Sequence, residues 1–299
     1  MIYLVWVAVF FCIAGALALL FDERMEYCLA PALCGGILLL YLFGLFGLLK
    51  PGLAAVALCG AVSAGYCLVR CVHGRTLFLR QWFTPAMLLA LVGVAYIAWV
   101  QRGRLVMGND EFSHWAVTVK MMTHLDALSI TQPDRMHFPE YPPATALLEY
   151  LFVRFTPNFT EGYLYRALNL LQLSLLVPYL GRFNLRRFGL ACAGMGALFL
   201  LPLAFYGEFY TDLCVDGVLA LLFAWTLFGW FGRRKRDKFA ALWVTLGCAA
   251  LTLTKSSGFA LALIALALIL WDSMRQRMGV LGHDRSLAHN LASQRLWLI

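Results

Sequence analysis

The sequence predicts an all-α, polytopic membrane protein with about nine transmembrane helices. Of its 299 residues, 62% are hydrophobic and only 13% are charged, and the mean hydropathy of +0.76 is far above that of a soluble domain. The apolar residues form runs near 20 residues long, which is the length a helix needs to cross the hydrocarbon core of a bilayer. Ten-residue segments with strand-like alternation, which are typical of membrane barrels, are absent from the sequence.

Nine hydrophobic runs are candidate spans: 2–21, 29–49, 52–70, 85–101, 162–180, 189–206, 212–231, 239–254 and 257–272. The first run has no basic segment before it and no small-residue cleavage site after it, so we expect a retained helix rather than a signal peptide. Three accessory helices (1–84) would precede a main module (85–272), and a cytoplasmic tail (273–299) would follow.

The positive charges predict how the chain is oriented. With the N-terminus outside, the cytoplasmic connections contain roughly twice as many Lys and Arg residues as the outer connections, which satisfies the positive-inside rule. We therefore expect a bacterial inner or plasma membrane protein with a cytoplasmic C-terminus and an outer loop at 102–161. The net charge of +8 is spread between apolar runs, which argues against a nucleic-acid partner. The nine cysteines lie mostly within those runs, without a CxxC pair, and are expected to be packing residues.

The outer loop contains two predicted helices. Residues 112–128 place apolar side chains at helical spacing. Residues 143–155 are too short and too charged for a crossing, so we expect this helix to lie in the outer membrane interface, with Tyr150 and Phe152 at headgroup depth.

The first candidate site is the polar start of this loop, around Asp110 and Glu111. His114 and Trp115 follow directly, and His137 lies later in the same loop. Charged side chains beside lipid are costly, so they suggest a functional site, with Asp110 and Glu111 as catalytic acids and the other three as acceptor or loop residues. The alternative is a solvated loop whose acids cap a helix.

A second group of acids, Glu208, Asp212 and Asp216, has a spacing of four residues. On a helix these side chains share one face, and Asp216 would lie about one turn inside the membrane. A carboxylate there needs a partner, a metal or water. The alternative is a structural salt bridge from Asp216 to Arg166 or Lys255.

A third group is basic and contains Lys255, in the turn Thr254-Lys255-Ser256-Ser257-Gly258, and Arg166. Both are candidates for binding a donor phosphate, although a lysine that reaches toward the interface gives the same pattern. Together the three groups suit transfer of a group from a lipid phosphate, with a carboxylate as base and cations on the leaving phosphate. A divalent metal, Mg or Mn, could bridge Asp110 and Asp216, but no ligand spacing requires one.

The order of these motifs resembles the GT-C superclass of polytopic glycosyltransferases, in the branch of protein O-mannosyltransferases and aminoarabinose transferases. The matching segments, spread over roughly 85–272, are Asp110-Glu111, Leu125-Asp126-Ala127-Leu128, Tyr141-Pro142-Pro143, Tyr165-Arg166-Ala167-Leu168, Arg186-Arg187-Phe188-Gly189, Tyr210-Thr211-Asp212, Asp216–Leu222 and Leu253–Gly258.

The resemblance implies an inverting sugar transfer from a polyprenyl-phosphate donor to an extracytoplasmic cell-envelope acceptor, with membrane lipid around the enzyme. It implies Asp110 first and Glu111 second as the catalytic or metal-binding group, and Asp216 as the partner acid. The three extra N-terminal spans and the missing C-terminal helices and soluble domain depart from the family and suggest a C-terminally truncated member. An envelope glycan polymerase or ligase, a transporter and a non-enzymatic membrane subunit are the alternatives.

Overall fold

The computed structural model describes residues 2–73, 81–131, 134, 138, 141–233 and 236–281, and throughout these ranges the regular elements are helices. The α-helices are α1 (Ile2–Phe21), α2 (Met25–Leu45), α3 (Leu49–His73), α5 (Pro85–Val100), α6 (Ala116–Leu125), α7 (Ala144–Val153), α8 (Gly162–Leu176), α9 (Phe188–Phe205), α10 (Asp216–Phe231), α11 (Lys238–Thr254) and α12 (Ser256–Leu281). A π-helical turn, η1 (Glu111–Trp115), leads into α6, and short 3-10 turns are η2 (Ser129–Thr131), η4 (Val177–Leu180) and η5 (Leu185–Arg187).

Within the described ranges, five helices are long and apolar enough to cross a membrane. They are α1, α2, α3, α9 with the turn before it, and α12. Four shorter apolar helices, α5, α7, α10 and α11, do not reach that length. The predicted class of an all-α protein with several membrane helices is therefore confirmed, whereas the count of nine spans stays a prediction.

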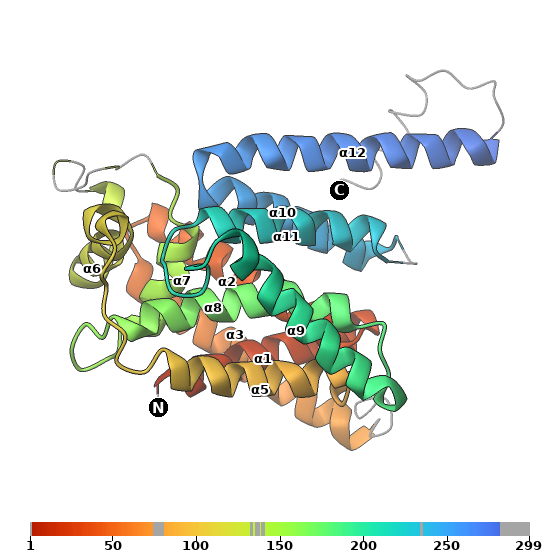
Figure 1. Cartoon of the computed structure of the whole chain (residues 1–299), viewed down its shortest axis with the longest axis horizontal. Coiled ribbons are helices and arrows are strands. Elements are labelled where there is room, and N and C mark those ends of the chain that lie inside the picture. The colour runs from red at the N-terminus through yellow and green to blue at the C-terminus, as the bar shows by residue number, and fades with distance from the viewer. Residues whose placement is uncertain are drawn as a thin grey trace.

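The helices lie side by side, most of them along the long axis of the molecule (Figure 1). Helix α6 and the N-terminus lie at the left end of this view, and α12 runs along the upper edge against α11 and α10. The polar segment that begins near Asp110 thus covers the end of the bundle at which the chain starts.

One continuous core joins the N-terminal helices to the rest of the chain. Helix α2 packs against α1 and α3, and also against α7, α8 and α11. Buried side chains from Tyr3 to Ala262 belong to the same cluster. Helices α1–α3 therefore share their core with the rest of the described chain, and the division at residue 84 stays a prediction.

Helix α7 is buried inside the protein, which corrects the prediction of an interfacial helix there. All ten residues from Ala144 to Val153 are buried, and Tyr150 and Phe152 are 0% exposed. Helices α2, α6 and α8 enclose it. The prediction was wrong because it assumed that a short helix beside a membrane contacts lipid. Helix α7 is instead covered by other helices.

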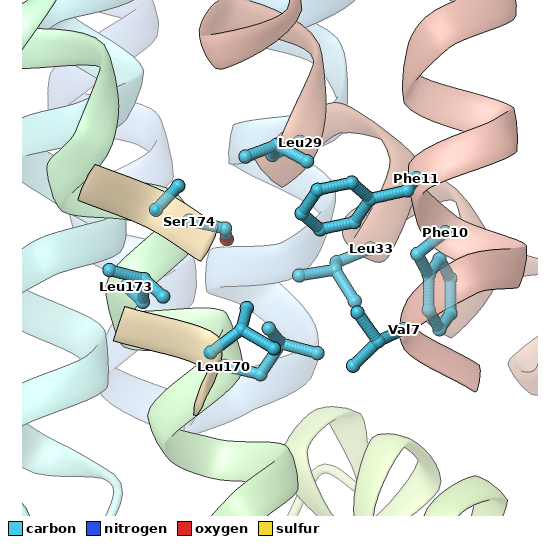
Figure 2. A pocket seen from close by; sticks show the side chains of 10 residues that line it. Val7, Phe10, Phe11, Leu29, Leu33, Leu170, Leu173 and Ser174 are labelled. Atoms are coloured by element: carbon cyan, nitrogen blue, oxygen red, sulfur yellow. The ribbon is translucent and has the colours of Figure 1, made fainter. Parts of the chain in front are cut away.

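Figure 2 shows the residues that line a small apolar cavity between α1, α2, α5 and α8. Its lining includes Phe10, Leu33 and Leu173, and its volume is about 10 Å³. That volume is no more than a single water molecule needs. These four helices are thus packed closely against one another at this point.

At the opposite end from α6, Arg233 contacts both the α1–α2 connection and the start of α11. Its guanidinium bonds the carboxylate of Glu23, between α1 and α2, and lies 4.7 Å from the ring centre of Phe239 in α11. Only 7% of this side chain is exposed. A buried arginine needs such a partner, so this ion pair fixes the α1–α2 connection against the α10–α11 connection.

Candidate functional site

Glu111 is a buried carboxylate with four hydrogen-bond donors. Its Oε1 accepts from the Tyr165 hydroxyl (2.8 Å) and from the backbone N–H of Leu213 (2.9 Å). Its Oε2 accepts from the backbone N–H groups of Met107 (3.0 Å) and Gly108 (2.8 Å). The side chain is 3% exposed. Glu111 therefore joins three parts of the chain that are far apart in sequence, and of the adjacent pair only Asp110 is accessible.

The segment between α9 and α10 is a loop, which corrects the expected helical face of Glu208, Asp212 and Asp216. Three of its carbonyl groups accept hydrogen bonds from side chains that are distant in sequence, while the carbonyls of Tyr206 and Glu208 accept from N–H groups within the loop. Gln101 donates to Tyr210 O (2.9 Å), Arg104 to Thr211 O (2.5 Å) and Gln172 to Phe209 O (3.3 Å). Backbone groups satisfied in this way do not require a helix.

The second acidic group is consequently spread along a loop. Asp216 is the first residue of α10 rather than a residue one turn inside it, and it is exposed. Glu208 is exposed too, and its carbonyl accepts from Thr211. Asp212 accepts from the Tyr206 hydroxyl and from the N–H of Cys214 (2.9 Å).

Asp110 and Asp212 both act on the thiol of Cys214. Burial, the hydrogen bond and charge of Asp212, and the negative charge of Asp110 raise the pKa of this thiol to about 12, and a hydrogen bond from Trp115 opposes them. Asp110 is exposed. The charge of Asp110 thus acts on the loop that carries Asp212, and Asp216 follows Cys214 by two residues, a Cα separation of at most about 7 Å.

His114 and Trp115 belong to an aromatic group beside this turn. The His114 ring is buried and packs edge-on against Trp115 and Tyr141, with ring centres 4.7 and 4.9 Å apart. Tyr141 also stacks on Trp115 (5.7 Å) and on Phe138 (5.1 Å). His137 lies outside the described residues.

Lys255 forms an ion pair with Asp216, which confirms the salt-bridge alternative for this acid. Lys255 Nζ lies 2.7 Å from Asp216 Oδ1, and 26% of the lysine side chain is exposed. The predicted turn is present between Thr254, the last residue of α11, and Ser256, the first of α12. A Cβ on Gly258 would lie 1.9 Å from the Leu251 carbonyl oxygen, so the tightness of the turn depends on glycine at this position.

Arg166 is directed to the end of α5 instead of to an acid. Its Nη2 donates to the carbonyl of Ala98 (2.8 Å), in the last turn of α5, and its guanidinium lies 4.9 Å from the Tyr163 ring centre. A cation at a helix C-terminus bonds carbonyls that have no partner within the helix. This contact gives Arg166 a structural role.

Metal binding finds limited support in this geometry. Throughout the described part of the chain, no group of three or more His, Cys, Asp or Glu side chains is arranged to hold a metal ion. Asp216, one of the two acids expected to bridge a metal, has the Lys255 ammonium against its carboxylate.

Several residues that build the site were not singled out from the sequence. Gln101, Arg104 and Gln172 hold the two loops in place, as does Glu161, which accepts from the N–H of Val106 (2.6 Å). Tyr165, which the sequence placed only in a matching motif, donates to Glu111. The sequence signal that could have identified them is a polar residue within an apolar run, such as Gln172. A polar side chain that is buried needs a hydrogen-bond partner, so its presence there indicates a contact with another segment.

Comparison with protein-family models, with curated proteins and with solved structures gave no match.

Proposed function

We propose that the protein is a membrane glycosyltransferase that moves a sugar from a polyprenyl-phosphate donor to a hydroxyl of an extracytoplasmic cell-envelope acceptor, with inversion. The observation that carries this proposal is the position of Asp110. It is the exposed member of an acid pair whose other member, Glu111, fixes both outer loops, and its charge acts on the thiol of Cys214, whose backbone N–H donates to Asp212.

Asp110 acts as the general base. It takes the proton of the acceptor hydroxyl as the new bond forms between that oxygen and the anomeric carbon of the donor sugar. The bond from the anomeric carbon to the phosphate oxygen breaks at the same time, and its electron pair leaves with the polyprenyl phosphate. A single displacement of this kind inverts the anomeric centre.

Lys255 stabilises the leaving phosphate. Its ammonium lies at the N-terminus of α12, where exposed Ser256 and Ser257 accompany backbone N–H groups of the first turn. Asp216 orients the lysine through their 2.7 Å contact. We assign no phosphate contact to Arg166, because the end of α5 already engages it.

Glu111 is assigned to positioning rather than to proton transfer. All four of its hydrogen bonds go to protein donors, and a 3% exposed side chain does not reach an acceptor. Its carboxylate holds the turn that presents Asp110 against the loop that presents Asp212.

Two observations favour this function over its alternatives. A transporter needs a substrate site near the middle of the membrane, whereas the cavity between α1, α2, α5 and α8 has room for no more than one water molecule. A polymerase or ligase acting on lipid pyrophosphates would use arginines of the outer loop. Of the arginines that the structure describes in this loop, Arg104 and Arg154 are instead bonded to Thr211 and Asp126, and Arg102 is exposed.

The test is sugar transfer in liposomes that contain a polyprenyl-phosphate sugar. We expect Asp110→Asn to lower turnover by about 100-fold or more, since general base catalysis contributes about 10²–10⁴-fold. Asp134→Asn is the matched control, because Asp134 is an exposed acid of the same loop. Full activity in Asp110→Asn would remove the role of Asp110, and flux across sealed vesicles without a covalent product would favour the transporter.

A further inference from the structure

An apolar groove of about 450 Å³ lies between α1 and α3, away from the acids of the candidate site. Helix α1 contributes Ile2, Val5, Trp6 and Val9, and α3 contributes Lys50, Leu53, Ala54 and Ala57, with Phe155 at the margin. Both sets recur at three- and four-residue spacing and so form facing stripes. From Ile2 to Val9 the groove runs for about 10 Å, at 1.5 Å per residue.

Small residues and one close helix contact shape this groove. Ala54 and Ala57 leave space on the α3 face. Farther along, a Cβ on Gly60 would lie 2.7 Å from a Val9 side-chain atom and 3.3 Å from its Cα, so the two helices approach each other there. The groove therefore closes toward Gly60 and opens toward Lys50.

Charge is confined to the open end. Lys50 is exposed, and it lies near the ion pair of Arg154 and Asp126, whose carboxylate it influences electrostatically. Arg154 already holds Asp126 through two hydrogen bonds of 2.5 and 2.8 Å, and the Tyr150 hydroxyl adds a third at 2.8 Å. One acid and two cations leave a net positive charge at the mouth.

We propose that this groove binds one anionic phospholipid of the surrounding bilayer, with an acyl chain along α1 and α3 and the phosphate at Lys50. The occupant must be apolar over the length of the groove and negative at one end only. Both helices that form the groove are long and apolar enough to cross a membrane, so the bilayer itself supplies such a molecule. This site is independent of the proposed sugar transfer.

Quenching of Trp6 fluorescence tests the proposal on the full chain. The protein is placed in phosphatidylcholine vesicles that contain either brominated phosphatidylglycerol or brominated phosphatidylcholine. The fluorescence of Trp6 is obtained by subtracting the tryptophan fluorescence of Trp6→Phe from that of the wild type. We expect brominated phosphatidylglycerol to quench this signal at an about fivefold lower fraction of the lipid, because one lysine at a membrane surface contributes about 1 kcal/mol of attraction to anionic lipid.

Two variants separate the headgroup from the groove. Lys50→Gln should abolish the fivefold preference, while Lys120→Gln, an exposed lysine of α6, should retain it. Ala54→Phe should fill the groove and reduce quenching by both lipids. Equal quenching of wild type by the two lipids, or undiminished quenching in Ala54→Phe, would overturn the proposal.

Native mass spectrometry gives a second measurement that needs no change at Trp6, a buried residue. The wild-type protein should retain one phosphatidylglycerol per chain, and Lys50→Gln and Ala54→Phe should lose it. Retention by both variants would contradict the assignment, as would a second copy of the chain in place of the lipid.

Discussion

Asp110 and Glu111 are neighbours in sequence, yet their surroundings are opposite. The π-helical turn that begins at Glu111 directs its carboxylate inward to Tyr165 and to the Leu213 N–H, and leaves Asp110 exposed. A carboxylate with four donors organises the backbone around it, while an exposed one remains free to meet a substrate. This contrast assigns different tasks to two residues of the same charge.

Glu111→Gln should detach the loop at 206–215 from the turn at 107–111 without unfolding the bundle. The amide group of glutamine would face backbone N–H groups, and a buried donor left without an acceptor costs about 1–3 kcal/mol. We therefore expect hydrogen exchange at Leu213, Met107 and Gly108 to rise by about 10- to 100-fold. Asp110→Asn is the control and should leave these amides protected. Unchanged exchange in Glu111→Gln would show that other contacts hold the loop.

Asp126, at the end of α6, accepts hydrogen bonds from Tyr150 of α7 and from Arg154. This residue ends α6 in the left-handed conformation (φ 50°) and receives Arg154, which directly follows α7. The hydrogen bond from Arg154, and less strongly that from Tyr150 and the charges of Arg154 and Lys50, lower the pKa of Asp126 against an opposing effect of burial.

The stability contributed by Asp126 should depend on pH. Because its folded-state pKa is lowered, this contribution is present above the unfolded value of about 3.9 and is lost as the pH falls through the folded pKa. Asp126→Asn should lower the free energy of unfolding in detergent by about 1.5 kcal/mol near pH 7, and the difference should shrink below about pH 4. Asp134→Asn serves as the control. A difference that stays constant in acid would refute this account.

Elements whose hydrophobic spacing and turn residues lie within one short segment were predicted well from the sequence. The helix after Asp110, the turn at Lys255 and most apolar helices follow from hydrophobic spacing, and the Lys255–Asp216 ion pair was one of two stated alternatives. The loop at 206–215 and the burial of α7 were not predicted. The loop depends on distant side chains such as those of Gln101 and Gln172, and the burial of α7 depends on the packing of α2, α6 and α8 around it. Spacing within one segment carries no information about such distant partners.

For the whole molecule, the arrangement of the ends leads to a prediction about sidedness. The N-terminus and α6 lie at the same end of the bundle (Figure 1), while the ion pair of Glu23 and Arg233 joins connections at the other. With the positive-inside bias, we expect the first end outside and the second in the cytoplasm.

Cysteine labelling with a membrane-impermeant maleimide can check this orientation. Arg102→Cys should react in intact cells, and Lys238→Cys should react only after the membrane is opened. Each of the two residues is exposed, and they lie at opposite ends of the bundle. The background should lack Cys59 and Cys192, two exposed native cysteines. Labelling of Lys238→Cys in intact cells would reverse the orientation and place the candidate site in the cytoplasm.

The burial of α7 also has a consequence for how the protein is made. Its ten residues are covered by α2, which is synthesised earlier, and by α8 and α11, which are synthesised later. Until α11 leaves the ribosome, α7 lacks part of its final cover. This end of the bundle can therefore reach its mature form only late in biogenesis, after most of the apolar helices have been synthesised.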